Sequence, residues 1–113
     1  MNVNIKVNGT SFHPLPEGAK LKIESEGQFE GISAAFLTGL LCPEPTNPYD
    51  PDAVAVYVPL TDGKAHHLGY VPKDADIKMQ IKTPKKALIL AKDFAAENPK
   101  YSVSYEIRQI GGM

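Results

Sequence analysis

Residues 43–58 read PEPTNPYDPDAVAVYV, a proline-rich loop that runs without a spacer into a β-branched strand. Four prolines fall within the ten residues 43–52, and each proline restricts its own φ angle. Rigid loops on a stable scaffold are common positions for binding residues. The fold and any binding site are therefore expected to be organised around this junction.

The loop contains two successive Asx-Pro turns, residues 47–49 and 50–52. In each turn, the side-chain oxygen of Asn47 or Asp50 is expected to accept a hydrogen bond from the N–H two residues on. The residue before each proline is also disfavoured in helical geometry. Tyr49 lies between the two turns, and a ring restrained in this way loses little entropy on binding.

Alternating apolar residues on both sides of the loop predict further strands. Val54, Val56 and Val58 share one face of the strand that follows the loop. The Asp-Gly pair at 62–63 predicts a hairpin turn, after which the chain returns antiparallel. The strands expected from these patterns cover residues 3–7, 21–23, 32–41, 53–58, 67–71 and 101–107.

Two helices are expected before the last strand. In residues 73–82, Ile77 and Ile81 fall four apart on one helical face. Thr83-Pro84 is typical of a helix start, and an apolar stripe follows until Asn98-Pro99. The predicted class is mainly β (α+β), with five to six antiparallel strands in a small barrel or strongly coiled sheet.

Length and composition fit one domain, residues 1–113. Cys42 is the only cysteine, which excludes an intramolecular disulfide and favours a reducing, cytoplasmic setting. No apolar run approaches the ~20 residues of a membrane span, and the polar first residues do not resemble a signal peptide.

Charge is unevenly distributed along the chain. Residues 1–63 carry three lysines and eight acids, whereas residues 64–113 carry nine Lys or Arg and five acids. The net charge of −1 excludes a strongly basic nucleic-acid footprint over the whole chain. The positive charge of residues 64–113 has two interpretations. It could form a local basic surface, or it could belong to a lysine-rich face that is merely solvated.

Two segments together resemble a HIRAN domain. They are EPTNPYDPDAVAV (44–56) and, after a short hairpin, LGYVPK (68–73). The opening VNGTSFH (7–13) is similar to the first strand of that family. The resemblance implies a modified OB-like β-barrel that captures the 3′ end of single-stranded DNA in repair or replication processing. It also implies a helicase or nuclease, encoded separately, as a partner.

The resemblance implies a role for each matching residue. Asp50 would accept from the terminal 3′-hydroxyl, and aromatic rings would stack on the terminal bases. Ser11 stands where the DNA-binding relative has an arginine, so Lys73 or His13 would have to replace that phosphate contact. The DNA-binding residues expected on this basis are Phe12, Asn47, Tyr49, Asp50, Tyr70 and Lys73.

Most of these residues also have a purely structural interpretation. Asp50 could serve only its own turn, and Tyr49 could cover the end of the barrel. Phe12 could be a core aromatic of a half-buried strand, and Lys73 could be solvated. The acidic first half and Ser11 suggest a second function, a protein-interaction or regulatory domain that keeps the barrel without binding DNA. A small-molecule binder is a third alternative, but its apolar pocket cannot be recognised from sequence.

Catalytic and metal-binding patterns are weak. His66 and His67 are neighbours on a predicted strand, so their side chains are expected to point to opposite faces rather than share an ion. The loop acids Glu44, Asp50 and Asp52 have no nearby partner in the sequence for acid–base catalysis. Phosphate-cradling glycine loops and nucleophile elbows are also lacking. We therefore expect neither an enzyme nor a cofactor.

Overall fold

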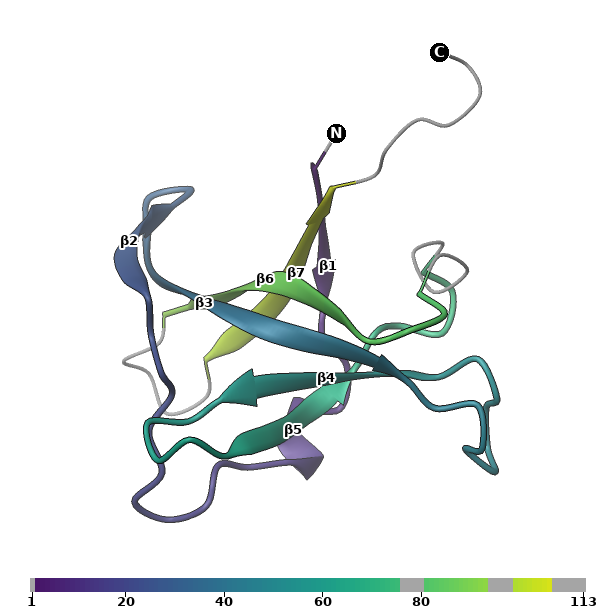
Figure 1. Ribbon diagram of the computed structural model, residues 1–113. Coiled ribbons are helices and arrows are strands. Elements are labelled where there is room, and N and C mark those ends of the chain that lie inside the picture. Colours follow the sequence, from purple (N-terminus) through teal and green to yellow (C-terminus); the bar gives the residue numbers. More distant parts are fainter. Residues whose placement is uncertain (1, 76–80, 94–98, 107–113) are drawn as a thin grey trace.

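The computed structural model describes residues 2–75, 81–93 and 99–106, which form an open, curled antiparallel half-barrel (Figure 1). One 3-10 turn, η1 (Thr10–Phe12), is the only helical element among these residues, and none of them forms a helix able to cross a membrane. The strands are β1 (Asn2–Lys6), β2 (Ser25–Phe29), β3 (Ile32–Pro43), β4 (Val54–Pro59), β5 (Ala65–Tyr70), β6 (Lys85–Lys92) and β7 (Lys100–Glu106). The predicted mainly β, barrel-like class is confirmed.

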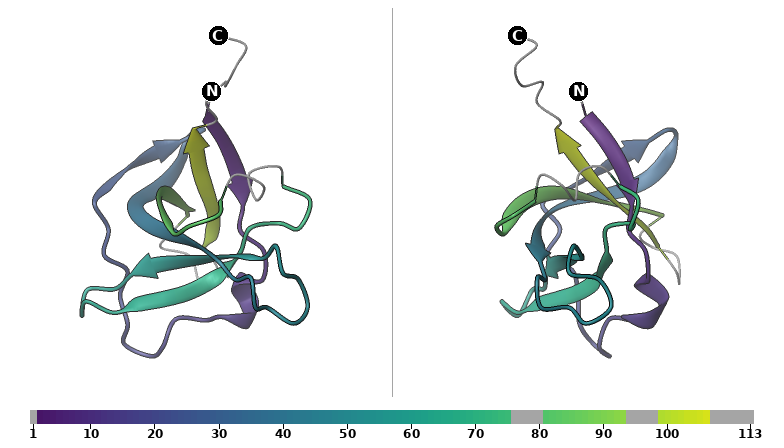
Figure 2. Two further views of the ribbon diagram at one scale, coloured as in Figure 1. Left: turned by 45° about the vertical axis from the view of Figure 1, so that its right-hand side comes forward. Right: turned by 90° about the vertical axis from the view of Figure 1, so that its right-hand side faces the viewer.

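The strands follow one path, β1-β7-β6-β3-β4-β5, and β2 pairs with β3 beside it. All pairs are antiparallel. The 12-residue β3 is the centre of the sheet, because it pairs with β2, β6 and β4 in turn along its length. Figure 2 shows how the sheet curls, so that β4 and β5 run across one end of the curve formed by β3, β6 and β7.

A short bridge connects the two ends of this path. Asn8, just after β1, and Tyr70, at the end of β5, exchange two backbone N–H···O hydrogen bonds of 2.9 Å each. Gly69 permits this approach, since an added Cβ would lie 2.9 Å from Val7 Cγ1 and closer still to the Asn8 carbonyl oxygen. The bridge sets η1 beside β5.

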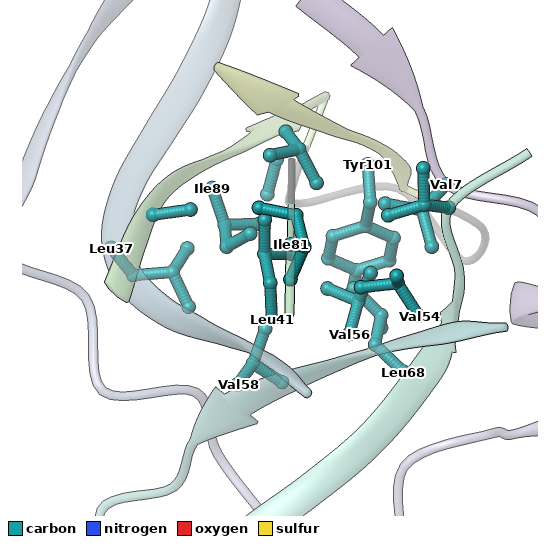
Figure 3. Close-up of a cluster of buried hydrophobic side chains, with 14 of the residues drawn as sticks. Val7, Leu37, Leu41, Val54, Val56, Val58, Leu68, Ile81, Ile89 and Tyr101 are labelled. Carbon is teal, nitrogen blue, oxygen red and sulfur yellow. The ribbon is translucent and has the colours of Figure 1, made fainter. Parts of the chain in front are cut away.

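The core lies on the concave side of the sheet (Figure 3). As predicted, Val54, Val56 and Val58 share the inner face of β4, and each is at most 1% exposed. They pack in one cluster with Leu37 of β3 and Ile89 of β6. Burial of a side chain of this size contributes about 1.5–3 kcal/mol, so the inner face holds the β4–β5 hairpin in place.

The structure confirms the predicted hairpin at Asp62-Gly63. It also contains strands where the sequence predicts them over 3–7, 32–41, 53–58, 67–71 and 101–107, and it corrects the strand predicted over 21–23. Gly63 has a φ of 88°, and the Asp62 carboxylate accepts from the Lys64 N–H at 2.9 Å in the turn. The strand predicted over 21–23 is reduced to a single bridge between Leu21 and Leu60, and β2 begins only at Ser25.

The predicted helix after Thr83-Pro84 is wrong, because these residues enter strand β6. The run from Ala87 to Ala91 is apolar throughout, a composition that suits a buried strand as well as a helix. β3 and β7 pair with β6 on its two sides and satisfy its backbone groups. Tertiary pairing thus overrides the local start signal. The helix predicted over 73–82 falls largely on residues 76–80, which lie outside the described residues.

Candidate nucleic-acid interface

The proline loop, residues 44–53, connects β3 to β4 and is organised by its own side chains. Asn47 Oδ1 accepts from the N–H groups of Tyr49 at 2.8 Å and Asp50 at 3.1 Å. Asp50 Oδ1 accepts from the Asp52 N–H at 2.9 Å. Both predicted Asx turns are therefore confirmed, and the loop projects beyond the ends of β3 and β4 (Figure 1).

Tyr49, at the tip of this loop, is 94% exposed. A residue that covered the end of the barrel would be buried, so the structural alternative for Tyr49 is wrong. The two turns restrict the backbone on both sides of the ring, which limits the entropy that a planar ligand would have to remove.

Glu44 joins the base of the proline loop to β5. Its Oε1 atom accepts from the Tyr70 hydroxyl at 2.9 Å and from Asn47 Nδ2 at 3.0 Å. Burial, together with the hydrogen bond to the Glu44 carboxylate, raises the pKa of Tyr70. Tyr70 thus remains a neutral hydroxyl donor at physiological pH, and the loop is tied to the sheet through one carboxylate oxygen.

A row of rings continues from Tyr70 across the outer face of the hairpin. We call His13, Tyr57, His67 and Tyr70 the aromatic–histidine row. The His67 ring stacks on Tyr57 at 5.0 Å between centroids and meets Tyr70 edge-on at 4.9 Å. The His13 ring lies 4.3 Å from His67. These residues come from β4, β5 and the segment after η1, so the row is a tertiary feature.

A β-bulge in β5 places His67 in this row. Val56 pairs with Gly69 but Tyr57 pairs with His67, so Leu68 is the extra residue of the bulge. In a regular strand, His67 and Tyr70 would point to opposite faces, because side chains alternate. The bulge brings both to one face while Leu68 remains buried, at 2% exposed.

The hydrogen bonds of His66 and His67 bear on the alternative that these two residues bind a metal ion. His66 Nε2–H donates to the His13 carbonyl oxygen at 2.8 Å, and His67 Nε2–H donates to Gly69 O at 3.1 Å. The two neighbouring histidines therefore have different partners. Among the described residues, no group of three or more His, Cys, Asp or Glu is arranged to hold a metal ion.

A comparison with known protein families matches residues 2–81 to the HIRAN domain. The chain belongs to the HIRAN domain family. HIRAN domains are generally nucleic-acid-binding domains. The match covers the proline loop and the whole aromatic–histidine row, whereas β6 and β7 lie beyond it. No curated protein and no solved structure was found to match the chain.

The remaining predicted residues of this HIRAN domain lie around the same hairpin. Phe12 is 83% exposed on η1, so its interpretation as a core aromatic is wrong. Lys73 is exposed and follows β5 closely in the chain. Asp50 is half-buried within its turn. The structure thus brings Asn47, Tyr49 and Asp50 together in one loop and joins them to Tyr70 through Glu44.

Sequence reasoning overlooked Tyr57 and His67 as part of this surface. The sequence patterns place Tyr57 only within the strand predicted over 53–58, and they place His67 in the strand predicted over 67–71, with metal binding as its one functional alternative. Their proximity depends on the bulge at Leu68, which leaves no clear period in the sequence. The adjacent Gly69 was the available signal, since a glycine within a strand often marks a bulge or a close backbone approach.

Proposed function

We propose that this HIRAN domain is a non-catalytic module that binds single-stranded DNA, preferentially at its 3′ end. The observation that carries the proposal is the exposed Tyr49 ring, held between two turns and connected through Glu44 to a row of further rings. Single strands are commonly bound by aromatic platforms, and each stacked base contributes about 1–3 kcal/mol.

In the proposed complex, Tyr49 and Phe12 stack on unpaired bases. Both rings are exposed and need no rearrangement of the core to make contact. A base presents a flat apolar face, so this contribution depends little on sequence. Stacking on these rings would therefore bind single strands of any base sequence.

Asp50 would accept a hydrogen bond from the terminal 3′-hydroxyl. A carboxylate has about four lone-pair positions, so Asp50 can keep its hydrogen bond to the Asp52 N–H and accept another. A 3′-phosphate at the same place would bring negative charge against this carboxylate. Lys73 would contribute positive charge toward the sugar–phosphate backbone, and the few cations involved predict a weak salt dependence.

Recognition of a free 3′ end fits a role in DNA repair or replication processing, with a separately encoded helicase or nuclease acting on the captured strand. This role rests on the family resemblance. The second candidate is a protein-interaction domain, favoured by the three carboxylates of the loop, Glu44, Asp50 and Asp52. A cationic protein segment would be the corresponding partner.

Fluorescence anisotropy with two labelled oligothymidines, one ending in a 3′-hydroxyl and one in a 3′-phosphate, tests the proposal. A hydrogen bond to a charged group is worth about 1.5–3 kcal/mol, so we expect at least tenfold tighter binding of the hydroxyl end. Asp50→Ala should remove this preference, while Thr46→Ala, an exposed neighbour, should keep it. Equal affinity for the two ends would refute end recognition, and absence of binding would favour the protein partner.

A further inference from the structure

All three histidines of the chain gather in one place. His66 and His67 lie on β5, and His13 follows η1, 53 residues before His66. The rings of His13 and His67 are 4.3 Å apart, and His66 donates to the His13 carbonyl oxygen. Two separate features bring them together. The bulge at Leu68 sets the face on which His67 lies, and the bridge at Asn8 holds the segment that leads to His13 beside β5.

The described residues include no arginine that could contact a phosphate at this surface. The one arginine of the chain, Arg108, lies outside the described residues. Ser11, next to Phe12, carries no charge. Lys73 supplies a cation beyond the end of β5. Among the described residues, a phosphate placed between Phe12 and Tyr70 would therefore meet the rings of His13 and His67.

Protonation would give His67 a new hydrogen-bond donor without loss of its present one. The Gly69 carbonyl can only accept, so the proton of a neutral His67 ring is on Nε2. A second proton must add to Nδ1, which then becomes a donor with positive charge. A phosphate diester accepts such charge-assisted hydrogen bonds strongly.

The surroundings of His13 disfavour the charged form of its ring when no ligand is bound. Burial, followed by repulsion from His67 and His66, lowers the pKa of His13. The other titratable groups around the rings are Tyr57 and Tyr70, with Glu44 and Cys42 next to them at the end of β3. Glu44 is the one acid among these neighbours, and it already accepts from the Tyr70 hydroxyl and Asn47.

We propose that His13 and His67 form a phosphate-binding subsite that becomes charged when ligand binds, so that DNA affinity increases as the pH falls. The inference rests on the proposed function and names the side chains that would contact the sugar–phosphate backbone of the DNA. His66 acts as a positioning residue, since its hydrogen bond holds the segment of His13 against β5. Binding would take up a proton from solution.

The direction in which DNA affinity changes with pH follows from proton linkage. An anion beside the rings favours their protonated form, so the bound state holds more protons than the free state. Affinity therefore increases as the pH falls through the window above the lowered pKa of free His13. One linked proton gives up to about tenfold in affinity for each pH unit within that window.

The test compares the dissociation constant of a 3′-hydroxyl oligothymidine at pH 8 and pH 6. The phosphodiesters of this probe do not titrate in that range. We expect roughly tenfold tighter binding at pH 6 from one linked proton. His13→Gln and His67→Gln should each reduce this gain to less than about threefold. Isothermal titration in two buffers should accordingly show less proton uptake for each variant than for the wild type.

Lys73→Gln is the matched control, because it removes a cation of this surface and leaves both histidines in place. It should weaken binding by the same factor at both pH values and keep the gain. Binding that is equally tight at pH 8 and pH 6, or a gain that survives both histidine substitutions, would overturn the subsite but leave the proposed function intact. Absence of binding at both pH values would overturn the proposed function and the subsite together.

Discussion

The proline loop and the aromatic–histidine row lie side by side but are built in different ways. The side-chain hydrogen bonds within the loop join residues two or three positions apart, as between Asn47 and the N–H groups of Tyr49 and Asp50. The row assembles rings from β4, β5 and the segment after η1. One structure is local and the other is tertiary, and Glu44 is their junction.

This difference predicts how each part responds to mutation. A local turn keeps its shape as long as its own side chains are present, whatever happens in the sheet. The row depends on the β5 bulge and on the Asn8–Tyr70 bridge, both of which require the sheet to be intact. Substitutions can therefore damage one part and spare the other.

The largest effect is expected from Gly69→Ala. The new Cβ would lie 2.9 Å from Val7 Cγ1 and against the Asn8 backbone, which cannot move without breaking the bridge. We expect a loss of about 1–3 kcal/mol in the free energy of unfolding. The histidine ring signals should shift in NMR spectra, while the amide signals of the proline loop should stay in place. Urea unfolding measures the stability change.

Gly27→Ala is the control for this substitution. Gly27 also lies within a strand, but the nearest atom to its added Cβ is Phe36 Cε2 at 3.7 Å, an ordinary contact. Its stability should change by less than about 1 kcal/mol. If both substitutions destabilise equally, the close approach at Gly69 does not determine how the row is held.

The next effect is expected from Asn47→Ala, which attacks the local part. The substitution removes three side-chain hydrogen bonds, two of them from backbone N–H groups of the loop. At this half-buried position, we expect a stability loss of about 1–2 kcal/mol. The loop amide signals should broaden or shift while the histidine ring signals remain, the reverse of Gly69→Ala. Simultaneous loss of both sets of signals would show that the loop is not locally stabilised.

The junction is tested by Tyr70→Phe, for which we expect a stability loss of about 1 kcal/mol at neutral pH. The change removes the hydroxyl that donates to Glu44 and keeps the ring in the row. Because burial raises the pKa of Tyr70 above its usual value of 10.0, this contribution is present at neutral pH and is lost when alkaline pH ionises the phenol. Tyr49→Phe, at an exposed ring, should leave stability unchanged, and a loss there as large as at Tyr70 would contradict the assignment.

The smallest effect is expected from the titration of His13. The pKa of His13 is lowered below 6.5 in the folded protein, so the unfolded chain binds a proton more readily. The free energy of unfolding should therefore decrease as the pH falls through about 6.5. Urea midpoints between pH 7.5 and 5.5 measure this slope, which should be shallower in His13→Gln. Parallel slopes in the two proteins would show that His13 does not contribute.

The same distinction explains what could be predicted from the sequence. The Asx turns and the Asp62-Gly63 hairpin follow from residues close in the chain, and both predictions are confirmed. The helix predicted after Thr83-Pro84 was wrong, because pairing of β6 with β3 and β7 outweighs a local start signal. The row was overlooked for a related reason, since a bulge in β5 changes which side chains share a face.

We propose that the proline loop and the aromatic–histidine row form one continuous binding surface. A titration of the ¹⁵N-labelled domain with a 3′-hydroxyl oligothymidine, followed by amide chemical shifts, tests it most directly. We expect the signals of Tyr49 and Asp50 to shift together with those of His67 and Tyr70, with one dissociation constant. Shifts confined to the loop, or centred instead on the exposed Leu40 and Leu88 of β3 and β6, would contradict it.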